Sequence, residues 1–302
     1  MPFTPGFDVD EVKELVAICT YLNFFPKVPD VTPPPPPIPQ EPVPGPLPCA
    51  WTLEEPVVEP LDHNAFQLGT RASDGRRLVA FRGTIDKLGS ILEDFDMVTI
   101  EADGFASDPR ARIHQGFHYG LKSMLSDLKK GIEPWVDALD DGETLELYVT
   151  GHSQGAAVAA LFGAWLHFGG WEPAQRITIK SYLFAQPRPG NTYFGYDYDQ
   201  VYTNRGMTVD VVNSLDIVPQ VPLTFQLPAD LNPRWEDLFN AVKIPEFLQK
   251  VFEIELPFTL DYRRVGSPIL LAGIAHPELF PKDYFFQHHA GRYWQLILDG
   301  RF

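Results

Sequence analysis

One glycine-flanked serine between two apolar segments most constrains how this chain can fold. The stretch VTGHSQGAAVAA, residues 149–160, leads from an apolar segment through Ser153 into a run of small residues. Gly151 and Gly155 relieve the crowding of a sharp turn, and the alanines that follow allow a helix to lie close to a sheet. The stretch predicts a strand–turn–helix unit that holds the Ser153 hydroxyl above the sheet, as in a nucleophile elbow. A purely structural turn would not require all of these features together.

A serine hydroxyl becomes a nucleophile only when a histidine accepts its proton and a carboxylate orients that histidine. Asp216 follows the apolar segment VDVVNS, where a strand would deliver it to the carboxyl edge of a parallel sheet. Asp210 lies within this strand and is predicted to be a strand-edge charge. The late histidines are His276, in a predicted surface loop, and the adjacent pair His288 and His289. The residue pattern alone does not decide which of these two histidines would accept the serine proton.

Apolar periodicity predicts strands that alternate with helices along most of the chain. Two strand-like segments flank the turn SDG and predict a β-hairpin. The predicted strands are residues 64–72, 76–84, 144–150, 176–186 and 208–216, and the predicted helices are residues 117–139 and 154–168. This order predicts one α/β domain over residues 61–302, with a mostly parallel sheet and helices on both faces.

Residues 1–60 differ from the rest of the chain in composition. Helical spacing of apolar residues over 8–25 predicts an amphipathic helix. Residues 26–60 hold 14 of the 30 prolines, and prolines supply no backbone N–H for a helix or a sheet. The segment is therefore predicted to be an extended strap that carries the first helix across the main domain. This interpretation is favoured over a ligand for the aromatic groove of a partner.

The charge balance and the motif inventory exclude several classes of function. With 24 Lys and Arg against 40 Asp and Glu, the net charge is −16, which disfavours nucleic acid and strongly anionic membranes as partners. No apolar run is long enough for a transmembrane span. The N-terminus lacks the features of a secretory signal, so an intracellular protein or a secreted one without its leader is expected. Cys19 and Cys49 are expected to be free thiols, and no metal or cofactor motif is present.

Six ordered segments carry a family resemblance. They are LVAFRGT (78–84), IHQGF (113–117), GHSQGA (151–156), SYLFAQPRPGN (181–191), VVNSLDIVPQVP (211–222) and HHAGRYW (288–294). Together they resemble the class 3, fungal-type triacylglycerol lipases, over about residues 60–225 and 261–296. The resemblance implies an α/β-hydrolase fold and hydrolysis of acyl esters without a cofactor or a metal. It also implies an ester or lipid substrate, met at a lipid–water interface.

The resemblance assigns roles to three residues. Ser153 matches the family's nucleophile, and Asp216 matches the carboxylate of its N-x-x-D-x-V-P block. The family's histidine usually stands five residues before an aromatic residue, and Tyr293 then selects His288 over His289.

The resemblance also implies how the site is completed and covered. Thr84 and the backbone N–H of Gln154 match the oxyanion hole. Gln154 replaces a more usual leucine, but only its backbone donor is needed. The family's lid corresponds to residues 85–97, which carry an apolar helical stripe. The helical insert 226–260 has no counterpart in the family core. Its apolar helical surface either packs on the core as scaffold or roofs an acyl pocket beside Ser153, and the roof is the prediction.

The leading interpretation is a lipase or carboxylesterase that acts on acylglycerol or phospholipid esters. A feruloyl-type esterase for polar esters is an alternative within the same class. A non-catalytic, lipase-like interaction module is an alternative of another class, and the complete set of Ser153, Asp216 and His288 argues against it. His114 and His152 are expected to be buried packing residues.

Overall fold

The computed structural model describes residues 2–24, 50–59, 64–83, 98–222, 261–276 and 283–302. Five expectations lie outside these ranges. They concern most of the proline-rich strap, the thiol of Cys49, Thr84, the lid segment 85–97 and the insert 226–260. They remain predictions.

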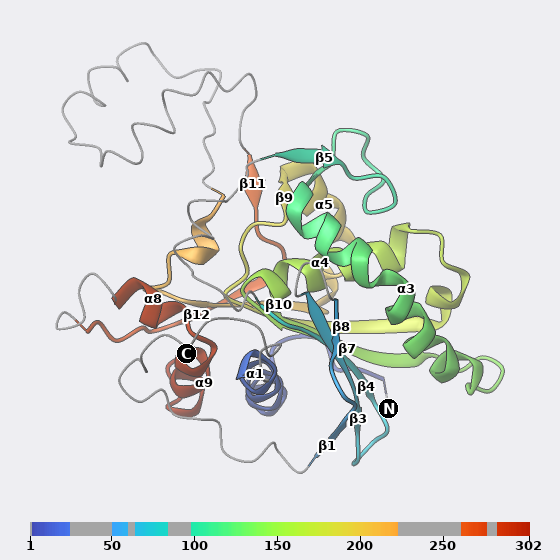
Figure 1. Ribbon diagram of the computed structural model, residues 1–302, viewed down its shortest axis with the longest axis horizontal. Helices are drawn as coiled ribbons and strands as arrows, with labels where there is room; N and C mark the ends of the chain where they lie inside the picture. The colour runs from blue at the N-terminus through green and yellow to red at the C-terminus, as the bar shows by residue number, and fades with distance from the viewer. Residues whose placement is uncertain (1, 25–49, 60–63, 84–97, 223–260, 277–282) are drawn as a thin grey trace.

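A central sheet organises the described part of the chain (Figure 1). Its strand order is β1-β3-β4-β7-β8-β10-β12, and β2 pairs with β3. The bounds are β1 Trp51–Leu53, β2 Val57–Val58, β3 Ala65–Arg71, β4 Arg77–Phe81, β7 Leu145–His152, β8 Ile177–Phe184, β10 Thr208–Asn213 and β12 Ser267–Leu271. Strands β4, β7, β8, β10 and β12 run parallel to one another, and β1, β2 and β4 are antiparallel to β3. The predicted hairpin and the mostly parallel sheet are confirmed.

A smaller antiparallel sheet lies beside the central one, with the order β11-β9-β6-β5. Its strands are β5 Thr99–Glu101, β6 Arg112–His114, β9 Gly190–Asn191 and β11 Tyr262–Arg263. Short 3₁₀ turns connect the main elements: η1 Glu172–Arg176, η2 Thr203–Arg205 and η3 Val218–Gln220.

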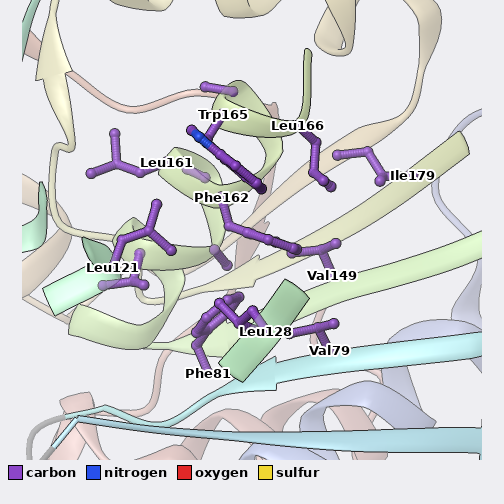
Figure 2. Packing of buried hydrophobic residues seen from close by; sticks show 14 of the residues in the cluster. Val79, Phe81, Leu121, Leu128, Val149, Leu161, Phe162, Trp165, Leu166 and Ile179 are labelled. Atoms are coloured by element: carbon purple, nitrogen blue, oxygen red, sulfur yellow. The ribbon is translucent and has the colours of Figure 1, made fainter. Parts of the chain in front are cut away.

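Helices cover both faces of the central sheet, as predicted (Figure 1). The helices are α1 Val9–Phe24, α3 Gln115–Asp137, α4 Gln154–Phe168, α5 Thr192–Val201, α8 Asp283–His288 and α9 Ala290–Leu298. Helices α3 and α4 pack on one face, where the rings of Phe81 and Phe162 lie 5.5 Å apart in the apolar core (Figure 2). Helices α1 and α9 pack on the other face. Strand β7 is buried almost throughout because it is covered on both sides.

In the part of the chain that is described, no helix is long and apolar enough to cross a lipid bilayer.

The prediction that the proline-rich segment contributes no strand to a sheet was wrong for its last residues. Residues 51–53 and 57–58 lie within the proline-rich segment, yet they form β1 and β2 and pair with β3. The run from Trp51 to Glu55 contains no proline and so keeps its backbone N–H groups. Pro56 falls between the two short strands at the border of the sheet, where proline is tolerated.

Helix α1 is held on the sheet by a buried polar cluster. The Glu11 carboxylate accepts hydrogen bonds from the hydroxyl groups of Tyr148 and Tyr182, both at 2.8 Å. It also pairs with the Lys180 ammonium at 2.6 Å, and this ammonium donates to the Thr4 carbonyl at 2.7 Å. A buried charge is tolerated when it is paired and hydrogen-bonded, as here. The N-terminal helix is therefore an integral part of the core.

Asp210 is not the strand-edge charge that its position suggested. It lies in the middle of β10, opposite Leu183 of β8 and Pro268 of β12, and its side chain is buried. The prediction was wrong because β12, which comes from a later part of the chain, covers the second side of β10. Asp210 forms an ion pair with the Arg264 guanidinium, whose Nε lies 3.5 Å from an Asp210 oxygen.

Candidate active site

Ser153 occupies a strained turn between β7 and α4. Its φ is 58° and its ψ is −131°, in the left-handed half of backbone space that non-glycine residues avoid. The two flanking glycines are required by space. A Cβ atom at Gly151 would overlap the Gly155 backbone, and one at Gly155 would overlap the Phe81 carbonyl. The strand–turn–helix unit predicted from the sequence is therefore present.

Three side chains that are distant in sequence meet at this turn. His288, the last residue of α8, has its Nε2 atom 2.8 Å from the Ser153 Oγ. The other ring nitrogen, Nδ1, lies 2.8 Å from a carboxylate oxygen of Asp216, which follows β10. All three residues are buried. This continuous chain of hydrogen bonds has the arrangement that serine nucleophiles use, in which the imidazole takes the hydroxyl proton and the carboxylate orients the imidazole.

The structure also distinguishes the two adjacent histidines geometrically. The His288 ring lies between Ser153 and Asp216. His289 instead precedes α9, and its backbone carbonyl accepts hydrogen bonds from Arg292 at 2.9 Å and Tyr293 at 3.3 Å.

Tyr293 contributes directly to the carboxylate. Its hydroxyl donates to Asp216 at 2.7 Å and accepts from the backbone N–H of Asn213 at 3.0 Å. The second Asp216 oxygen accepts from the Val218 N–H at 2.9 Å. Burial and the nearby carboxylate raise the Tyr293 pKa well above its ordinary value, so the phenol keeps its proton. In the sequence, Tyr293 served only to select His288 by its spacing, and its contact with Asp216 was missed. The fixed spacing of an aromatic residue from the histidine was the signal that could have suggested this contact.

The surroundings of the predicted oxyanion hole are described in part. Gln154 is the first residue of α4, which places its backbone N–H at the helix N-terminus beside Ser153. Thr84 lies outside the described residues, but Gly83 directly before it contacts the elbow. A Cβ atom at Gly83 would lie 2.8 Å from the His152 carbonyl oxygen and 3.3 Å from the Ser153 Cβ. The residues that lead from β4 toward Thr84 therefore pass next to the serine.

Two further histidines are buried, as the sequence indicated. His114 precedes α3, and its Nδ1 accepts hydrogen bonds from the N–H groups of Gly116 at 3.1 Å and Phe117 at 3.4 Å. It therefore caps the helix. His152 is the last residue of β7, directly before Ser153. Burial, followed by the charge of His288, holds the His152 pKa well below the ordinary histidine value.

Asp210 offers a matched comparison with Asp216, because both carboxylates belong to the same strand and its exit. We expect Asp216→Asn to lower turnover by about 10⁴-fold and Asp210→Asn to leave it within about tenfold. The His288 ring is bonded to Asp216 and Ser153, whereas the Asp210 carboxylate faces Arg264. Equal losses of turnover in the two variants would contradict this assignment.

The same substitution is expected to change how stability depends on pH. Burial raises the Asp210 pKa to about 7, and Arg264 offsets part of this rise. The folded chain thus binds this proton more tightly than the unfolded chain, and it loses stability as pH rises from about 4 to about 7. The Asp210→Asn variant carries no such proton. Its free energy of unfolding, relative to the natural chain, should rise with pH by up to about 1.4 kcal/mol per unit in this window. Urea unfolding at pH 5 and pH 8 measures the difference, and a difference that falls with pH would refute it.

The parallel sheet, the strained serine turn and the chain order Ser153, Asp216, His288 define an α/β-hydrolase fold. The sequence profile of the family described as Lipase (class 3) matches residues 78–226. The six sequence segments indicated the same family, and the resemblance to it is confirmed over this range.

Several named proteins are similar to this chain. Phospholipase A1-II 4 of Oryza sativa subsp. japonica is 31% identical over 168 residues, which are 50% of this chain and 41% of that protein. Phospholipase A1-Igamma1, chloroplastic, of Arabidopsis thaliana is 28% identical over 254 residues, 76% of this chain and 45% of that protein. The chain thus spans less than half the length of these two relatives.

Solved structures share the fold at lower identity. The Rhizomucor miehei triacylglyceride lipase is 13% identical, with a TM-score of 0.60 over 96% of this chain and 99% of that one. A triacylglycerol lipase whose catalytic centre is described as a serine protease triad is 16% identical, with a TM-score of 0.52 over 81% of this chain and 83% of that one.

Proposed function

We propose that this chain is a serine hydrolase that cleaves carboxylic esters of lipids, with acylglycerols or phospholipids as substrates. The observation that carries the proposal is the buried hydrogen-bond chain from Ser153 through His288 to Asp216. The names of the relatives support the substrate class, because they include phospholipases A1 and triacylglycerol lipases. A lipid–water interface is where such substrates would be met.

The reaction follows from the positions of the three side chains. His288 Nε2 accepts the Ser153 proton as Oγ attacks the ester carbonyl, while Asp216 stabilises the imidazolium that forms. The proton is then passed to the departing alcohol, which leaves an acyl group on Ser153. Water, deprotonated by the same histidine, attacks this acyl-enzyme and releases the carboxylic acid.

The negative charge of the tetrahedral intermediate needs donors that are already in place. The backbone N–H of Gln154 is one proposed donor, at the N-terminus of α4. Thr84 supplies the second in the proposed scheme. Each such donor contributes on the order of 3 kcal/mol to transition-state stabilisation.

A series of esters tests the proposal. The purified chain would be assayed on p-nitrophenyl esters of increasing acyl length, on dispersed triacylglycerol and phosphatidylcholine, and on methyl ferulate. We expect turnover of the long-chain lipid esters to exceed turnover of the ferulate ester. Preference for methyl ferulate would favour the polar-ester alternative. Absence of turnover on every ester by a folded chain would favour the non-catalytic module.

A further inference from the structure

Asn23, in the C-terminal turn of α1, contacts the residue that precedes Ser153. Its side-chain amide lies between two segments that border the site. The Oδ1 atom accepts a hydrogen bond from the Gly83 N–H at 3.2 Å, and the Nδ2 atom lies 3.2 Å from the His152 Nδ1. One amide thus bridges the residue before Ser153 and the residue before Thr84.

The donors and acceptors of this bridge have a single consistent assignment. The Gly83 N–H can only donate, so the Asn23 oxygen faces it and the Asn23 NH₂ group faces His152. The His152 Nδ1 must then accept, and its proton resides on Nε2. This Nε2 lies 2.8 Å from the His288 backbone carbonyl, which can only accept. His152 is thereby neutral with an Nε2–H, in agreement with its lowered pKa.

The consequence is a link from the N-terminal helix to the proposed general base. The His152 Nε2–H holds the backbone of His288 at the end of α8, and the two rings lie 4.9 Å apart. Asn23 itself has a fixed position, because the Glu11 cluster anchors the same helix on the sheet. Cys19, one turn before Asn23, is buried against Thr150 with its Sγ 3.5 Å from the threonine Oγ1.

We propose that Asn23 is a positioning residue for this site. It fixes the Nε2–H tautomer of His152 and so the backbone of His288, and it holds Gly83 beside the serine turn. The kinetic part of the proposal rests on the proposed function, whereas the tautomer part does not. A helix that lies far from Ser153 in sequence would then set the geometry of proton transfer.

Kinetics of Asn23→Ala test the positioning role against a matched control. We expect kcat on a soluble p-nitrophenyl ester to fall about 10- to 100-fold, because small displacements of reacting groups have effects of this size. KM should stay within about twofold. Cys19→Ala is the control, since it loosens the packing of the same helix but keeps the amide. It should retain kcat within about threefold at a similar loss of unfolding free energy. Equal losses of kcat in both variants, or an unchanged kcat in Asn23→Ala, would overturn the kinetic role.

A second measurement needs no turnover. Long-range ¹H–¹⁵N NMR of the histidine side chains should show His152 with a proton on Nε2 and none on Nδ1 between pH 6 and pH 8. In Asn23→Asp the carboxylate still accepts from Gly83 but cannot donate to Nδ1, so this nitrogen should gain a proton. A proton on Nδ1 in the natural chain, or no change in Asn23→Asp, would overturn the proposal. If the natural chain cleaves no ester, the proposed function fails, and the tautomer measurement still decides the role of Asn23.

Discussion

Replacing Ser153 by alanine is expected to lower ester turnover by about 10⁶-fold and to leave the fold intact. The physical reason is that no other group could take the place of the Oγ atom 2.8 Å from the His288 imidazole. Alanine keeps the Cβ atom and the strained φ of 58°, so the turn itself should persist. The measurements are the initial rate on the best ester of the series and the thermal unfolding midpoint.

A substitution at the next residue controls for disturbance of the backbone turn at Ser153. Gln154→Ala removes a side chain that donates to Asn64 at 3.4 Å but keeps the backbone N–H. It should retain turnover within about tenfold. Turnover of Ser153→Ala within a few-fold of the natural chain would refute the nucleophile assignment.

Replacing His288 by alanine is expected to lower turnover by a similar factor, about 10⁶-fold, because the serine hydroxyl would lose the base that accepts its proton. The adjacent His289→Ala variant is the matched control and should retain turnover within about tenfold, since the His288 ring is the one between Ser153 and Asp216.

A fluorophosphonate probe tests independently which of the two histidines activates Ser153. It reacts with an activated serine, so labelling of Ser153 should be slow in His288→Ala and fast in His289→Ala. The reverse pattern would show that His289 activates the serine and that the geometry of the pair differs in solution.

Five strands of the central sheet, β3, β4, β7, β8 and β10, could be predicted because their signals are local. Glycines at 151 and 155 are demanded by backbone contacts within a few residues, and the sequence displays them directly. Asp216 was placed near the site by a similar argument, since the exit of a parallel strand lies at the carboxyl edge of its sheet. The predicted strands and helices therefore correspond closely to the observed ones.

The environment of Asp210 could not be predicted in this way. Whether a strand lies at the edge depends on which other strand pairs beside it, and β12 comes from residues 267–271, more than 50 residues later. Likewise β1 and β2 join the sheet from a proline-rich segment that seemed unsuitable for strands. Long-range pairing decided both cases.

The sequence by itself determined the strand–turn–helix unit around Ser153, the parallel sheet and the resemblance to the class 3 lipases, because hydrophobic periodicity and glycine spacing act over short distances. Tertiary structure alone decided which ring stands between Ser153 and Asp216, that Tyr293 donates to Asp216, and that Asn23 reaches His152. Each of these contacts joins residues that lie at least 72 positions apart in the sequence. Hydrogen bonds of this kind have a range of about 3 Å. They form only after packing of α1, α8 and α9 against the sheet has brought their donors and acceptors together.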